Sequence, residues 1–100
     1  MQTPAYFVFN VTAIHDPQGM LPYQQKVLDT VTAHHGSLLV GGGEVDSVEG
    51  PKVQGKFFIV RFDSTEAAQA WYHSPDYQSI IGHRHASASC QAFLLAGLPV

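Results

Sequence analysis

Seven side chains of this sequence have the chemistry to hold a small organic molecule. An imidazole titrates near neutral pH, a guanidinium offers a fork that matches a carboxylate, and a tyrosine combines an apolar ring with a hydroxyl. We predict that these groups supply the polar contacts of a binding site. The predicted ligand-binding residues are Asn10, Tyr23, His35, Arg61, Tyr72, Tyr77 and Arg84.

Two of these residues carry alternative interpretations. His35 is the candidate catalytic residue, as a general acid or base or as a ligand for a substrate oxygen; alternatively, it ends a helix and hydrogen-bonds an unpaired carbonyl. Arg84 could clamp a carboxylate, or it could hold the Asp76–Tyr77 segment or a helix end in place. The tyrosines Tyr72 and Tyr77 are expected at the rim of a cavity or of a dimer interface.

Other motifs point away from metal, phosphate and nucleophile chemistry. The segments His34-His35 and His83-Arg84-His85 could suggest a metal site, but no Glu or Cys lies at a recognisable ligand spacing from them. Ser74 lacks a Gly-x-Ser-x-Gly elbow, and Gly41-Gly42-Gly43 is not followed by Gly-Lys-Ser/Thr. Cys90 is expected to be an inert thiol. We therefore predict no metal, no cofactor and no nucleophilic serine or cysteine.

The composition narrows the class of protein. The chain of 100 residues carries a formal charge of −3 from five basic and eight acidic side chains. No run of Lys or Arg is present to follow a phosphate backbone, so no nucleic acid is expected as a partner. No apolar run has the length of a membrane span, and the first residues do not resemble a signal peptide. With its single cysteine, the sequence predicts a cytoplasmic protein.

The elements that must position these residues follow from hydrophobic periodicity. Strands are predicted at residues 6–14, at 38–40 with a continuation at 44–48, at 56–62 and at 86–95. Helices are predicted at 20–34, with Pro22 in the first turn, and from a cap at Asp63 to Pro75, followed by a short helical turn at 77–81. The order β-α-β-β-α-β predicts an α+β, ferredoxin-like fold with a four-stranded antiparallel sheet and two helices on one face. Residues 1–100 are expected to form one domain.

The strands predict a second partner for the sheet. Alternation along residues 6–13 and 57–62 leaves neither sheet face polar. Two helices cover only one face of a four-stranded sheet. The other face is apolar except for Asn10, Thr12 and Arg61, so we predict a homodimer in which two sheets face each other. Trp71 lies on the Ala67-Ala70 side of its helix and is expected in the core.

With these elements in place, the chain resembles the bacterial DUF1330 family of the dimeric α/β-barrel group over nearly its whole length. The matching residues are Asp16-Pro17, Tyr23, His35-Gly36, Gly42-Gly43, Glu49-Gly50, Phe62-Asp63-Ser64, Glu66-Ala67, Trp71-Tyr72, Ser74-Pro75, Tyr77-Gln78, Arg84 and Gly97. The resemblance implies the fold and a dimer more than an activity, since relatives in the barrel group include monooxygenases, haem-degrading proteins and members with no assigned reaction.

Two positions depart from the family pattern. The family has His-Gly-Gly and a basic residue where this chain has His35-Gly36-Ser37-Leu38, and Met20 stands where an aromatic residue is common. Any anion contact from that basic residue is lost here.

Two functions remain open from the sequence. The first is a small-molecule-binding homodimer, whose sharpest version is a cofactor-independent enzyme acting on a small organic substrate; the oxygenase reading rests on fold analogy. The alternative is a non-catalytic dimerisation or regulatory module with no ligand cavity.

Overall fold

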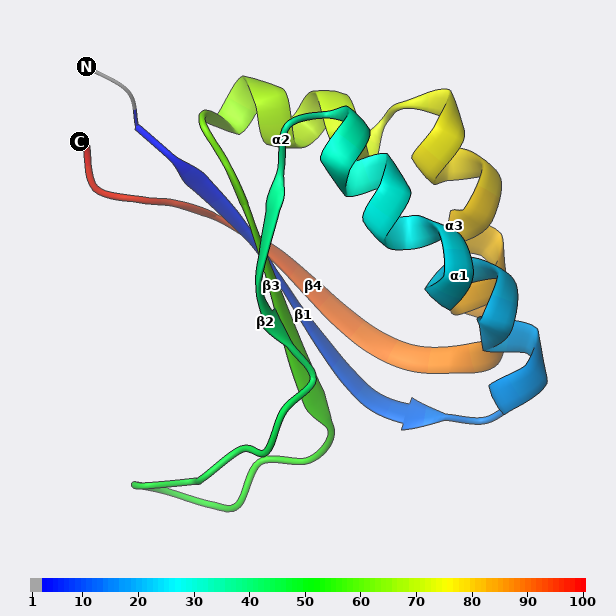
Figure 1. Ribbon diagram of the computed structural model, residues 1–100. Coiled ribbons are helices and arrows are strands. Elements are labelled where there is room, and N and C mark those ends of the chain that lie inside the picture. The colour runs from blue at the N-terminus through cyan, green and yellow to red at the C-terminus, as the bar shows by residue number, and fades with distance from the viewer. Residues whose placement is uncertain (1–2) are drawn as a thin grey trace.

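Four antiparallel strands form one sheet in the order β2-β3-β1-β4. The structure is a computed structural model that describes residues 3–100. It confirms the predicted ferredoxin-like α+β fold, with the two most hydrophobic strands at the centre of the sheet (Figure 1). The strands are β1 (Ala5–Ile14), β2 (Ser37–Gly41), β3 (Lys56–Phe62) and β4 (Ala88–Ala96).

Three helices lie on one face of this sheet (Figure 1). They are α1 (Pro17–Ala33), α2 (Thr65–Tyr72) and α3 (Pro75–Ser87). Helix α1 packs mainly along α3 and touches the sheet at β2. None of the helices within residues 3–100 has the length and hydropathy of a membrane-spanning segment.

The third helix corrects the predicted short turn at 77–81. Ser74 caps α3, because its hydroxyl accepts a hydrogen bond from the Tyr77 amide at 3.3 Å, and Pro75 fits the first helical position. The Ser-Pro pair thus starts a helix as well as ending the previous one. As a result Arg84 lies in α3 instead of before the last strand, and β4 begins at Ala88 instead of at residue 86.

Three further boundaries differ from the sequence prediction. Helix α1 begins at Pro17 behind the cap Asp16, so Pro22 lies inside it, and α2 is capped by Ser64 rather than by Asp63. Residues 44–48 form no strand. Gly42 adopts a φ of 81°, which turns the chain away from β3 and leaves that segment without a pairing partner.

An aromatic cluster around Trp71 fills the core at one end of the sheet. The Trp71 side chain is fully buried, as predicted, and its ring centroid lies 5.4 Å from those of Phe7 and Phe62 and 4.1 Å from that of Tyr77. Its indole N–H donates a hydrogen bond to the Thr30 hydroxyl at 3.0 Å. This contact ties α2 to α1 and satisfies the one polar atom of the indole.

The opposite face of the sheet carries apolar side chains that no element of residues 3–100 covers fully. On this face, Val8 of the central strand β1 lies opposite Ile59 on β3 and Phe93 on β4. Phe93 is 48% exposed, and Val8 and Ile59 are half-buried. We call this face the outer face of the sheet.

Candidate functional site

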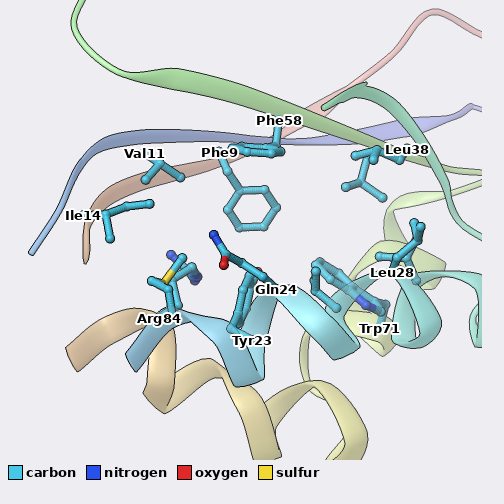
Figure 2. A pocket seen from close by; sticks show the side chains of 14 residues that line it. Phe9, Val11, Ile14, Tyr23, Gln24, Leu28, Leu38, Phe58, Trp71 and Arg84 are labelled. Carbon is cyan, nitrogen blue, oxygen red and sulfur yellow. The ribbon is translucent and has the colours of Figure 1, made fainter. Parts of the chain in front are cut away.

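A cavity of about 420 Å³ lies between the sheet and helix α1. Helix α1 packs mainly along α3, and the cavity lies beside it over β1 and β3, where Phe9, Val11 and Phe58 line it (Figure 2). Its volume falls within the usual range of small-molecule sites, roughly 300–1,000 Å³. Its lining includes Phe9, Ile14, Tyr23, Gln24, Leu28 and Arg84.

The cavity has an exposed mouth and a buried floor. Ile14, Leu28 and Leu38 are 43%, 52% and 45% exposed, whereas Phe9 and Trp71 are only 5% and 0% exposed. Figure 2 shows these side chains facing one another across the space between β1, β2 and α1. An apolar molecule could therefore enter from solvent and bury most of its surface against side chains that are already ordered.

Arg84 is the basic group in the wall of this cavity. It is 4% exposed, and its guanidinium carbon lies 5.3 Å from the centroid of the Phe9 ring and 5.5 Å from that of Tyr23. Both distances fit cation–π contacts. The Nε atom is buried and has no hydrogen-bond acceptor.

No carboxylate balances this buried charge. Within residues 3–100 the ion pairs join His34 to Asp76 at 3.4 Å and Arg61 to Asp63 at 2.9 Å, so Arg84 belongs to neither. Burial works to lower the pKa of Arg84, but the neighbouring Tyr77 and Tyr23, which attract the guanidinium once they ionise at high pH, and Cys90 outweigh it, so the pKa stands above its usual value. Arg84 is therefore a permanent cation in an apolar wall.

Two tyrosines support the same wall from behind. The hydroxyls of Tyr23 and Tyr77 lie 2.8 Å apart and share a hydrogen bond. Burial is the main cause that raises the pKa of each tyrosine above its usual value, so both hydroxyls are neutral at physiological pH. The Tyr23 ring lines the cavity, while Tyr77 is fully buried beneath it.

The structure thus brings together some of the seven predicted residues. Tyr23 and Arg84 line the cavity, and Tyr77 contacts Tyr23 one layer deeper. The rim position expected for Tyr77 is not found, because the residue is fully buried. Tyr72 does not line the cavity either; its ring stacks on Phe7 at 5.4 Å.

Asn10 and Arg61 lie away from the cavity, on the outer face. The Asn10 amide donates to the Gln54 carbonyl at 3.3 Å, and Arg61 donates to Asp63 at 2.9 Å. Both have partners within this chain. Alternation along β1 and β3 explains the separation, because Asn10 and Arg61 point to the side opposite Phe9 and Val60.

His35 lies at the end of α1, exposed and outside the cavity. It has a φ of 61°, its amide donates to the Thr32 carbonyl at 3.0 Å, and the Gly36 amide donates to the Val31 carbonyl at 2.9 Å. This pair of bonds is a Schellman motif, with His35 in the left-handed position that glycine usually takes. The geometry matches the helix-ending interpretation of the residue.

The histidines show no metal cluster. Helix α3 carries His83 and His85 on its exposed side, and residues 3–100 contain no group of three His, Cys, Asp or Glu side chains that could hold an ion.

Sequence reasoning missed most of the apolar wall and one polar group in it. Gln24 lines the cavity, and Figure 2 shows its amide directed from α1 toward the sheet. The helical stripe that includes Tyr23 and Val27 also contains Met20 and Gln24 at three- and four-residue spacing. That stripe could have marked them as members of the same face, but it does not reveal that the face borders an empty space.

Comparisons with known proteins agree with this fold. The sequence profile of DUF1330, described as a domain of unknown function, matches residues 4–98. No curated protein sequence matches the chain.

Solved structures extend the likeness at low identity. RPA0582, a protein of unknown function from Rhodopseudomonas palustris, is 18% identical with a TM-score of 0.72, over 100% of this chain and 86% of its own. SnoaB, a cofactor-independent oxygenase from Streptomyces nogalater, is 13% identical with a TM-score of 0.59, and the match covers 97% of this chain and 95% of SnoaB. A dimeric ferredoxin-like protein of unknown function from Thermobifida fusca is 8% identical with a TM-score of 0.55, and the match covers 96% of this chain and 92% of that protein.

Proposed function

Because this chain belongs to the DUF1330 family, a domain of unknown function, we propose a function from its cavity: the protein binds a small, largely apolar organic molecule between the sheet and α1. The observation that carries the proposal is a cavity of about 420 Å³ with an apolar wall and few polar groups, chiefly Arg84, Tyr23 and Gln24. Convergence of a few polar groups on an apolar hollow is typical of ligand sites.

Cofactor-independent catalysis is the enzymatic form of this proposal. It is supported by the fold that the chain shares with SnoaB, and at 13% identity that support extends to the fold alone. In this form the Arg84 cation would stabilise negative charge that develops on a bound substrate. His35 has no part in it, because it lies outside the cavity.

Fluorescence of Trp71 offers a direct test of binding. This residue is the single tryptophan of the chain and lies in the floor of the cavity, so a ligand that displaces water there should change its emission. We expect saturable titrations with members of a panel of small aromatic and aliphatic molecules. A flat response across the panel would contradict the proposal.

A matched pair of variants locates the binding. Val27→Phe adds bulk in the cavity wall and should abolish binding, whereas Leu21→Phe makes a comparable change on the same helix at a position that is 47% exposed and outside the cavity. Equal binding by the two variants would place the ligand elsewhere.

A homodimer formed through the outer face is the second part of the proposal. The uncovered row Ile59–Val8–Phe93 supports it, since apolar patches of this kind commonly mark protein interfaces. The dimeric description of the Thermobifida fusca neighbour agrees with it. The alternative function, a non-catalytic dimerisation or regulatory module with no ligand cavity, is disfavoured by the cavity that reaches Arg84. A cytoplasmic location belongs to both proposals.

A further inference from the structure

We infer that the ligand is an organic monoanion, with an apolar body in the cavity and one carboxylate or similar oxyanion paired with the Arg84 guanidinium. This inference rests on the proposed small-molecule function and adds the charge and chemical class of the ligand.

The first support is the unbalanced charge of Arg84. Its guanidinium is in contact with two aromatic faces, and its buried Nε has no acceptor. A charge that is removed from water without a partner is costly, so buried cations in proteins are normally paired. An anion in the adjacent cavity would supply a partner of opposite charge for the guanidinium.

The second support is that the neighbours of Arg84 within residues 3–100 do not neutralise its charge. A structural arginine in the last turn of a helix would be expected to bond a carbonyl or a carboxylate. Within residues 3–100 the Arg84 side chain interacts with Tyr23 and Tyr77, whose hydroxyls are neutral at physiological pH, and Asp76 pairs with His34 instead. The interaction with Tyr77 agrees with the interpretation of Arg84 as a clamp for the Asp76–Tyr77 segment, but a neutral hydroxyl leaves the guanidinium charge unbalanced.

The third support concerns the number of charges. Among the residues that line the cavity, Arg84 is the single basic group, and no acidic group accompanies it. A single cation in an apolar wall balances one negative charge. A dianionic phosphate ester would leave one charge unpaired in the same surroundings, and a cationic ligand would be repelled.

The test compares three probes with the same apolar chain and different charge: octanoate, octanamide and octylammonium. Each is titrated into the full-length protein, and Trp71 emission reports binding. We expect octanoate to bind at least about tenfold more tightly than octanamide, since a charge-assisted hydrogen bond contributes roughly that much discrimination. Octylammonium should bind more weakly than the amide.

Variants assign the preference to Arg84. In Arg84→Met the preference for octanoate over octanamide should disappear while octanamide still binds, and Arg84→Lys should keep part of it. Lys52→Met removes a positive charge from an exposed loop and should leave the preference unchanged. A preference that persists in Arg84→Met would overturn the inference.

The outcomes also separate this inference from the proposed function. If octanoate and octanamide bind wild-type protein equally well, the inference is wrong and the cavity remains a binding site for neutral molecules. If none of the probes binds, and the aromatic and aliphatic panel is also silent, the proposed function fails and the inference fails with it.

Discussion

Replacing Arg84 with methionine should raise the free energy of unfolding by about 1–2 kcal/mol. The ligand-free protein holds the guanidinium in an apolar wall at 4% exposure, with no carboxylate partner. Methionine keeps an unbranched stem, has a similar helix propensity and needs no hydrogen bond. The substitution should therefore remove a cost of folding without leaving a large void.

The magnitude follows from three contributions. Burying an ion costs several kcal/mol after relaxation of the surroundings. The two aromatic contacts at 5.3 and 5.5 Å return about 1 kcal/mol each. The position of Arg84 in the last turn of α3 adds about 0.5 kcal/mol through the helix dipole. The difference leaves the folded state about 1–2 kcal/mol less stable than its methionine variant.

Urea denaturation followed by circular dichroism and by Trp71 fluorescence measures this difference, provided that both proteins unfold with the same dependence on urea. Arg84→Lys is the informative comparison. An ammonium is more strongly hydrated than a guanidinium and stacks less well on aromatic rings, so we expect the Arg84→Lys protein to be less stable than wild type. The expected order of stability is Arg84→Met, then wild type, then Arg84→Lys.

A methionine variant that is less stable than wild type by more than about 1 kcal/mol would refute this reasoning. It would mean that Arg84 makes strong interactions in the folded chain and is a structural residue. Such a result would also weaken the inferred role of an anionic ligand.

Three other predictions concern His35, the tyrosine pair and the outer face. His35→Gly should raise the free energy of unfolding by about 1 kcal/mol, because φ is 61° there, whereas His34→Gly should lower it. Above pH 10 a tyrosine in the unfolded chain loses its proton, while buried Tyr23 and Tyr77, with raised pKa values, keep theirs. The free energy of unfolding should therefore be constant up to about pH 10 and then fall by up to about 1.4 kcal/mol per pH unit for each tyrosine. Tyr23→Phe should reduce that slope in urea denaturation measured at several pH values. Phe93→Glu should convert a dimer into a monomer in light scattering, and a variant that stays dimeric would contradict the sheet-to-sheet interface.

The sequence determined the fold through local patterns. Alternation in residues 6–14 and 56–62 identified the central strands. The spacing of Tyr23, Val27, Leu28 and Val31 predicted the inner face of α1, on which Leu28 is half exposed at the mouth of the cavity. It also placed Trp71 in the core. These features depend on periodicity within one element, which one sequence displays directly. The full length of the third helix was not predicted, because a Ser-Pro pair can end one helix and start the next, and the sequence alone favoured only the first of these roles.

Only the tertiary structure decided which polar residues share a site. Tyr23 and Arg84 lie 61 positions apart in numbering, and they meet because α1 packs along α3. Asn10 and Arg61, equally plausible by residue type, fall on the opposite face of the sheet, and His35 remains at an exposed helix end. A cavity is the space that packing leaves unfilled, so no single element encodes it. That Arg84 is a buried charge with no carboxylate partner within residues 3–100 becomes visible only once its neighbours in space are known.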